Sequence, residues 1–388
     1  MTSSVHTRRL LCIHDRPDTR DRRRTDALSQ TSATEDTVHA AIGDVERFCR
    51  AVFLAAGTDE ATADAATRAM MHGSRLGVDS HGVRLLDHYI AAMTGGRVNK
   101  RPNMTVTQSV PAVALLDADH GHGALATYRA MDKAIELADT CGIGAVSIRN
   151  SSHFGPAGAY ALDAAQRGYI GAAFCNSDSF VRLHDGAMRF HGTNPIAFAV
   201  PVTGQMPWLL DMATSAIPYN RVKLYRSLGR ELPAGVASDV EGRDIRDPSL
   251  AEMLAPVGGE FGFKGAGLAG LVEILSAVLS GMRLSFDLLP MNGPDFSTPR
   301  ALGAFVLAMK PGAFVPEDVF NAGMQRYVEV LRSSPPRDGM RVMAPGDREW
   351  VVAEEREQGG VPLDPATREA FVKLGERFGL ETPALLRF

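Results

Sequence analysis

The pattern of apolar and polar positions gives the chain a helical beginning, an alternating middle and a helical end. Over residues 36–56 apolar side chains recur every three or four positions, and Gly57 ends the pattern. This spacing predicts an amphipathic helix. A second, alanine-rich helix is predicted over residues 59–72, and a third follows a glycine-bounded loop within residues 73–90. Residues 94–110 are rich in glycine, proline and asparagine, which predicts a connection.

From residue 111 onward short apolar runs alternate with helical patterns, which is typical of an α/β fold. The short runs predict strands at residues 113–116, 145–148, 170–174, 196–200, 208–212 and 302–309. Helical spacing predicts helices at residues 124–141, 157–167, 265–282, 316–332 and 364–379. We therefore expect a helical segment over residues 37–110, an α/β core over 111–310, and a C-terminal helical segment over 311–388 that packs on the N-terminal one.

Residues 1–36 differ from the rest because seven arginines are mixed with Asp15, Asp18, Asp21 and Asp26. The acids argue against a transit peptide, and the apolar run at residues 10–13 is too short for a signal peptide. We expect a disordered extension, and an arginine-rich docking arm is the alternative.

Composition narrows the class of protein. With 45% hydrophobic and 22% charged residues the chain is typical of a globular protein. A net charge of −4 and only 7% aromatic residues argue against a nucleic-acid partner. Four scattered cysteines without a CxxC pair argue against a disulfide scaffold or a structural zinc, and they suit a reducing cytoplasm. Without an HExxH motif we also expect no protein-bound metal.

The most apolar stretch, residues 265–282, contains Glu273 and Ser276. A membrane span needs about 20 predominantly apolar residues. We therefore predict a buried or half-buried helix here, with no membrane partner.

A glycine motif at residues 121–126, GHGALA, resembles the start of a Rossmann dinucleotide site. Asp117 and Asp119 stand just before it, and two acids would repel a pyrophosphate. The next strand also ends in Arg149 and Asn150 rather than in the acid that would bind a ribose. We interpret the motif as a turn and a helix start.

Two histidines stand in loops where they could do acid–base chemistry. His81 lies in the glycine-flanked segment DSHG, where Ser80 could orient its ring and Arg84 could pair a carboxylate. His153 follows a predicted strand, and the carboxyl ends of strands are where α/β folds bind ligands. A solvated loop histidine and a helix N-cap region are the structural alternatives.

Further polar residues follow predicted strands or open a helix. Ser177 comes after one strand, and Asp211, which could orient a histidine, ends another. A glycine-rich loop brings Lys264 to the start of a helix, where it could hold a phosphate, although the loop is not a P-loop.

Taken in order, these segments resemble the malate/L-lactate dehydrogenase family, the type that is unrelated to classical lactate dehydrogenases and includes sulfolactate and ureidoglycolate dehydrogenases. The resemblance covers about residues 37–350 and is carried by GVDSHGVRLLDHY, IRNSSHFGPAGAYAL, FCNSDSF, HGTNPIAFAVP, LLDMATS and GFKGAGLAGLVEIL.

The resemblance implies a non-Rossmann, NAD- or NADP-dependent oxidoreductase that acts on small 2-hydroxy or 2-oxo acids, and a homodimer. It implies proton transfer by His81 or His153. The cofactor contacts that it implies fall on Ser177, Asp211, Met212, Ala213, Lys264, Gly303, Ala304 and Phe305.

Three departures from the family's pattern bear on the substrate. Members often carry an arginine where this chain has Leu85, and Arg84 stands one position earlier. They often have GHF where this chain has GAF at residues 303–305. An unusual stretch at residues 181–185 offers Arg182 or His184 as the substrate cation instead.

Three alternative functions stay open or are disfavoured. A cyclic 2-imino acid reductase of the piperideine or pyrroline-2-carboxylate type stays open, as does a catalytically silent nucleotide-binding relative. A serine hydrolase using Ser80 is disfavoured because no GxSxG motif is present. For NADP, Arg221 and Lys223 are candidate 2′-phosphate ligands, and a solvated surface is their other interpretation.

Overall fold

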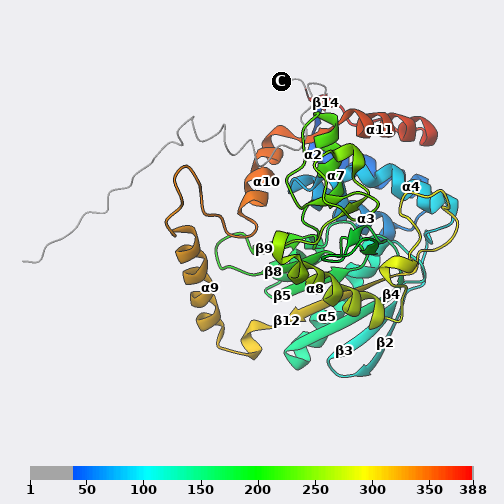
Figure 1. Cartoon of the computed structure of the whole chain (residues 1–388). Coiled ribbons are helices and arrows are strands. Elements are labelled where there is room, and N and C mark those ends of the chain that lie inside the picture. Colours follow the sequence, from blue (N-terminus) through cyan, green and yellow to red (C-terminus); the bar gives the residue numbers. More distant parts are fainter. Residues whose placement is uncertain (1–37, 387–388) are drawn as a thin grey trace, which may run out of the picture.

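The computed structural model describes residues 38–386, so the prediction for residues 1–36 lies outside the described residues. A seven-stranded sheet runs through the lower part of the molecule, and most of the helices that do not pack directly on this sheet lie above it (Figure 1). The order of its strands is β2-β3-β4-β12-β5-β8-β9. Their bounds are Thr105–Val110, Val113–Asp117, Ile143–Ser151, Leu302–Met309, Ile170–Cys175, Ile196–Val200 and Trp208–Met212.

Only β3 and β4 run parallel, and every other neighbouring pair in this sheet is antiparallel. A Rossmann sheet is mostly parallel, so the α/β but non-Rossmann core expected from the sequence is confirmed. The six predicted strands all form. The sequence missed β2, whose exposed TVTQSV pattern carries little apolar signal.

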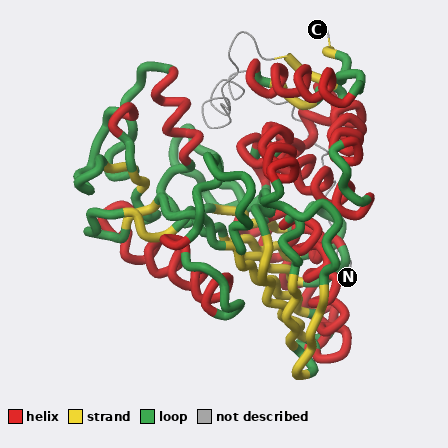
Figure 2. The backbone as a smooth tube through the Cα atoms, turned by 90° about the vertical axis from the view of Figure 1, so that its right-hand side faces the viewer, coloured by secondary structure: helices red, strands yellow, loops and turns green. Residues whose placement is uncertain are grey.

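Helices cover both faces of the sheet (Figure 2). On one face, α5 (Gly123–Cys141) and α6 (Gly158–Gln166) bury alanine, leucine and tyrosine side chains against the strands. On the other face, α8 (Gly262–Glu273) continues into the π-helical turn Ile274–Val278, and Val272 and Leu275 pack against Phe174 and Ile196. Small residues on α5 and α6 let these helices approach the sheet closely.

The helix predicted within residues 265–282 is this α8 segment. Among the described residues, only the stretch Gly259–Val278 is apolar and long enough to cross a membrane by length and composition. Its Val272, Glu273 and Ser276 are buried inside the protein, as we expected of a half-buried helix. Its outer side, by contrast, exposes a row of apolar side chains, namely Phe263, Leu268, Leu271, Ile274, Val278 and Leu279.

A second layer contains the first and last helices of the described chain. It is built from α2 (Ile42–Ala55), α3 (Glu60–Arg75), α4 (Leu86–Gly95), α10 (Asp347–Gly359) and α11 (Pro365–Phe378). Beside them, β1 (Val38–Ala40) pairs with β13 (Val361–Leu363) and β14 (Leu385–Leu386). Phe48 of α2 packs against Phe371 of α11, so the two ends of the described chain share one core.

Two further regions complete the fold. A four-stranded sheet of short strands is formed by β10 (Ala237–Ser238), β11 (Met253–Leu254), β6 (Val181–Arg182) and β7 (Arg189–His191), with α7 (Tyr219–Ser227) beside it. Helix α9 (Glu317–Arg332) projects from the body as an arm (Figure 1). Only Val328 of α9 is buried.

Candidate active site

Two histidines face each other where the helical layer meets the α/β core. His81 ends the one-turn helix Asp79–His81, and His153 lies just beyond the end of β4. Their rings stack with centroids 5.7 Å apart and an angle of 22° between the planes. Both side chains are half-buried. The fold therefore brings together two histidines that stand 72 positions apart in the sequence (153 − 81).

Each of these rings is held through its Nδ1 atom. The Ser80 hydroxyl lies 2.9 Å from Nδ1 of His81. The hydroxyl of Tyr89, a buried residue on α4, lies 2.8 Å from Nδ1 of His153. When the Tyr89 hydroxyl donates this bond, His153 carries its proton on Nε2. Nε2 can then donate its proton to a ligand. When Nδ1 instead carries the proton and donates it to the tyrosine oxygen, Nε2 is free to accept one.

Both histidines are neutral at pH 7. Burial lowers the pKa of His81 to about 4. Burial, together with the neighbouring His81 ring, lowers the pKa of His153 well below its ordinary value. Burial also raises the pKa of the Tyr89 hydroxyl, so this group stays protonated. The pair is thus uncharged and able to take up a proton.

Sequence reasoning missed three residues of this cluster. His122 is 1% exposed, accepts a hydrogen bond from the Ala124 N–H at Nδ1, and packs edge-on against the Tyr89 ring at 4.4 Å. His88 lies 5.8 Å from the Phe296 ring, centroid to centroid. The signal was present for His88 and Tyr89, which follow His81 in the same segment. An aromatic residue at a helical position is, however, usually a core residue.

Asp211 does not reach the histidine pair. Its carboxylate accepts a 2.9 Å hydrogen bond from the Gly158 N–H, at the first turn of α6. Burial raises the pKa of Asp211 to about 6. We expected this carboxylate to orient a histidine, and the structure gives it a helix N-terminus as partner instead.

Of the four predicted substrate-binding residues, only Ser80 contacts a histidine of the pair. Arg84 is half-exposed, with its guanidinium 3.7 Å from the Asp364 carboxylate. Arg182 is buried and forms a 2.7 Å ion pair with Asp244. His184 packs edge-on against the Phe263 ring at 5.9 Å. Arg182 and His184 therefore make their contacts in other parts of the fold.

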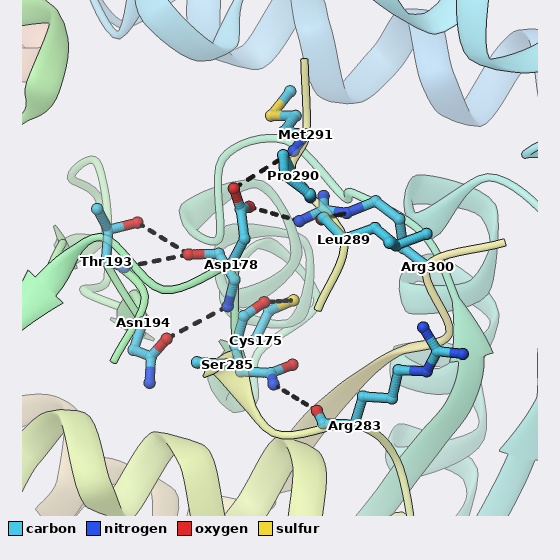
Figure 3. Close-up of polar contacts among 12 residues, drawn as sticks. Cys175, Asp178, Thr193, Asn194, Arg283, Ser285, Leu289, Pro290, Met291 and Arg300 are labelled. Carbon is cyan, nitrogen blue, oxygen red and sulfur yellow. Dashed lines mark hydrogen bonds and ion pairs between the residues drawn. The ribbon is translucent and has the colours of Figure 1, made fainter. Parts of the chain in front are cut away.

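The segment after β5 is fixed on both sides (Figure 3). On one side, the Ser177 N–H donates to Asn194 Oδ1 at 3.3 Å, and the Thr193 N–H donates to Ser177 Oγ at 3.1 Å. On the other side, the Asp178 carboxylate pairs with the buried Arg300 and accepts the Met291 N–H. The predicted cofactor residue Ser177 thus lies in a loop with little freedom to move.

A buried carboxylate also holds this loop in place through hydrogen bonds. Glu273 of α8 is 6% exposed and accepts four hydrogen bonds from neutral donors. The donors are the Asn176 and Asn194 side-chain amides at 3.3 and 2.8 Å, and the Ser285 N–H and hydroxyl, both at 2.6 Å. No cation of the described chain forms an ion pair with Glu273. The carboxylate ties α8 to three separate loops.

The other predicted cofactor residues lie in different surroundings. Lys264 is exposed in the first turn of α8, with its ammonium 5.3 Å from the Phe261 ring centroid. Met212 and Ala213 are half-buried at the end of β9. Gly303 and Ala304 are buried in β12, where a side chain on Gly303 would collide with Ser276, and Phe305 packs into the core on the α8 face. Close packing alone therefore accounts for Gly303.

No cluster of three or more histidine, cysteine or acidic side chains that could hold a metal ion occurs within residues 38–386.

Comparison with known proteins gives one consistent result. The family model described as malate/L-lactate dehydrogenase matches residues 41–371. The malate dehydrogenase of Pyrococcus abyssi is 34% identical over 333 residues, which cover 84% of this chain and 91% of that protein. The (2R)-3-sulfolactate dehydrogenase (NADP(+)) of Chromohalobacter salexigens is 33% identical over 316 residues, which cover 81% of this chain and 91% of the relative.

Solved structures agree with this result. The malate dehydrogenase of Pyrococcus horikoshii OT3 is similar with a TM-score of 0.82 at 30% identity, covering 90% of this chain and 98% of that one. The delta1-piperideine-2-carboxylate reductase of Pseudomonas syringae pvar. tomato has a TM-score of 0.76 at 26% identity, covering 87% and 99%.

Proposed function

This chain belongs to the malate/L-lactate dehydrogenase family, and from that premise we propose that it is an NAD(P)-dependent oxidoreductase transferring a hydride between nicotinamide and a small 2-hydroxy or 2-oxo acid. The observation that carries the proposal is the stacked, neutral pair of His81 and His153, each held through Nδ1. Interconverting an alcohol and a ketone requires a group that accepts or donates a proton at the oxygen.

His81 is our candidate for the proton transfer, and His153 lines the substrate pocket or exchanges roles with it. A neutral imidazole that carries its proton on Nδ1, where the Ser80 oxygen accepts it, leaves Nε2 free to accept the hydroxyl proton of a 2-hydroxy acid. In the reverse direction the protonated ring returns the proton to the alkoxide. Ser80 and Tyr89 keep the two rings in place, so that Nε2 rather than Nδ1 meets the substrate oxygen.

Arg84 is our candidate for the substrate carboxylate. Its ion pair with Asp364 is long, at 3.7 Å, and its side chain is 50% exposed. Such pairs contribute only about 0–1 kcal/mol. The guanidinium therefore loses little when it leaves Asp364 for the carboxylate of a bound acid.

Other residues at strand and helix ends suit a dinucleotide. Asn176 is 1% exposed, and its Oδ1 atom has no hydrogen-bond partner among the described residues, so it can accept a donor from a polar ligand. Lys264, in the first turn of α8, suits a phosphate. Ser177, Asp211, Met212 and Ala213 stand at strand ends, where they would hold the rest of the cofactor. When bound, the nicotinamide supplies or accepts the hydride.

A homodimer is part of the proposal. The outer side of α8 and its π-helical turn exposes the apolar row already described, and α9 has an amphipathic sequence with one buried residue. A contiguous row of exposed apolar side chains marks an interaction site. Sedimentation of the purified protein would test the dimer. With no cysteine of the described chain in a disulfide, we place the enzyme in the reducing cytoplasm.

A specific observation keeps one alternative substrate class open. The likeness to the piperideine-2-carboxylate reductase suits reduction of a cyclic 2-imino acid, which needs the same hydride and proton transfers. A silent nucleotide-binding relative is disfavoured because both histidines are present and held in place.

A panel assay tests the function. Purified protein would be followed by nicotinamide absorbance with NADH and NADPH against pyruvate, oxaloacetate, 2-oxo-4-methylthiobutyrate, diketogulonate and piperideine-2-carboxylate, and in reverse with malate, lactate, sulfolactate and ureidoglycolate. Turnover of an open-chain acid is the expected result. Turnover of piperideine-2-carboxylate alone would favour the alternative. Nucleotide binding without turnover of any substrate would contradict both.

A further inference from the structure

The loop that carries His81 is clamped by a residue from the far end of the chain. Arg356, on α10, forms a two-pronged ion pair with Asp79, with Nη1 to Oδ1 at 2.6 Å and Nη2 to Oδ2 at 2.8 Å. The same guanidinium donates to the main-chain carbonyl of Ser74, on α3. Its side chain is 9% exposed, against 27% for Asp79. Arg356 therefore connects three segments through one buried group.

The short helix of His81 also lies unusually close to α3. A side chain on Gly82 would collide with Ser74, and one on Gly73 would come within 2.8 Å of the His81 carbonyl. The Ser74 hydroxyl accepts the Val83 N–H at 2.9 Å. Backbone therefore packs directly on backbone on this side of the loop. Arg356 in turn links Asp79, where the turn begins, to the same Ser74 of α3.

We propose that Arg356 is a positioning residue for His81, which makes the C-terminal helix α10 part of the active-site architecture. The inference rests on the proposed function in taking His81 as the proton carrier. Asp79 and His81 share a single helical turn of three residues, so a shift of the Asp79 carboxylate moves the imidazole with it. A misplacement of about 1 Å can cost about 100-fold in rate.

The geometry of the clamp explains why arginine occupies this position. A guanidinium is planar and presents several donors at fixed angles, so it can serve both carboxylate oxygens and a carbonyl at once. A lysine ammonium is a point charge on a flexible stem and would keep the charge without the planar match. Arg356→Lys is therefore a sensitive probe of position rather than of charge.

The test is a double-mutant cycle with Asp79→Ala, Arg356→Ala and the double variant, together with Arg356→Lys and Asp79→Asn. Arg75→Ala is the matched control, because it removes an exposed ion pair with Glu46 from the same stretch of α3. We expect Arg356→Ala to lower kcat about 10- to 100-fold. The dissociation constant of NAD(P)H should stay within about twofold, because the proposed cofactor residues lie elsewhere. The double variant should be no slower than the slower single one.

Hydrogen exchange at residues 79–83 supplies a readout that does not depend on turnover. Arg356→Ala, and to a smaller degree Arg356→Lys, should speed exchange there, while Arg75→Ala should not. Unchanged kcat or unchanged exchange in Arg356→Ala overturns the proposal, and so do additive effects in the cycle. If the alanine variants do not fold, Arg356→Lys and Asp79→Asn carry the same comparison. Absence of turnover in the wild type counts against the proposed function, and exchange still decides whether Arg356 holds the loop.

Discussion

The two sides of the site are each held by a buried ionised group, and the two groups are satisfied in different ways. On the histidine side, the Asp79 carboxylate meets the opposite charge of Arg356. On the proposed cofactor side, formed by the loop of Ser177, the Glu273 carboxylate accepts hydrogen bonds from four neutral donors and has no ion-pair partner within the described chain. One arrangement joins two charges, and the other surrounds a single charge with dipoles.

This difference determines whether a substitution on each side lowers the catalytic rate or the stability of the fold. Asp79 is partly exposed, so water can replace part of the contribution of Arg356, and the loss falls mainly on position. Glu273 is buried, and the N–H and hydroxyl of Ser285 lose their acceptor when the carboxylate is removed, whereas the amides of Asn176 and Asn194 keep the carbonyls of Arg283 and Ala269. The histidine side should therefore respond to substitution in its rate, and the cofactor side in its stability.

The largest effect should come from removing the chemistry on the histidine side. His81→Ala should lower kcat by about 10²–10⁴-fold, the usual value of general acid–base catalysis. Affinity for NAD(P)H should not change, since the cofactor side is untouched. Steady-state kinetics and fluorescence titration check both statements. Near wild-type turnover would contradict the role of His81, and a larger loss in His153→Ala would transfer that role to His153.

The next effect should appear on the cofactor side as lost stability. Glu273→Gln keeps the shape but turns an amide nitrogen toward groups that are themselves donors. We expect the free energy of unfolding to fall by about 2–4 kcal/mol. Urea denaturation measures it. Glu252→Gln, which removes an exposed carboxylate paired with Arg189, serves as the control and should cost at most about 1 kcal/mol. Equal losses in the two variants would show that the buried hydrogen bonds of Glu273 contribute no more to stability than the exposed ion pair of Glu252.

Substitution of Arg84 tests binding of the substrate carboxylate separately from the Asp79–Arg356 and Glu273 contacts. Arg84→Ala should raise the KM of the oxo acid about 10- to 100-fold, because a hydrogen bond to a charged group contributes about 1.5–3 kcal/mol. Asp364→Asn frees the guanidinium and keeps an N-cap acceptor for α11, so it should leave KM unchanged or lower it. An unchanged KM in Arg84→Ala would assign the carboxylate to another cation.

The smallest effect is a difference in acid sensitivity. Burial lowers the pKa of His122 to about 3, below the value of about 6.5 for an unfolded histidine. The unfolded chain therefore takes up the proton first, so this stability is complete above about pH 6.5 and is lost as the pH falls. His122→Asn keeps an acceptor for the Ala124 N–H and should flatten the decline by up to about 1.4 kcal/mol per pH unit.

Denaturation at pH 7 and pH 5 measures this slope. Asp211 works in the opposite direction, because burial raises its pKa to about 6 and its contribution is lost as the pH rises. It is one group against several buried histidines, so the net effect of acid should be destabilising. If the free energy of unfolding of His122→Asn changes with pH as steeply as that of the wild type, His122 does not contribute to the acid sensitivity.

The sequence predicted the local structure and offered candidate reacting groups, but it did not predict the groups that hold those candidates in place. Apolar periodicity predicted six strands of the main sheet and all of the helices that cover it. His81 and His153 were recognised as candidates because loops and strand ends present side chains to ligands. Their stacking was not predictable, since it depends on how α3 and β4 meet in space.

The supporting residues were missed for different physical reasons. Glu273 gave a signal, because a single acid in an apolar helix requires either a surface position or a set of donors. Arg356 gave none, since it lies in a helix crowded with charges and its partner is 277 positions away. Arg182 and His184 were chosen from an unusual stretch, but Arg182 pairs with Asp244 and His184 packs against Phe263 of α8. Long-range pairs of this kind follow from the fold and not from spacing.

The position of β12 has a consequence for how the protein folds during synthesis. This strand lies between β4 and β5, although the chain reaches it only after β8, β9 and α8. During synthesis, β4 and β5 therefore wait with facing edges unpaired until a late segment arrives to join them. The sheet closes as one long-range event, which makes folding slow and leaves the nascent chain open to misassembly. A truncated chain that ends before residue 302 lacks the strand that unites the two halves of its sheet.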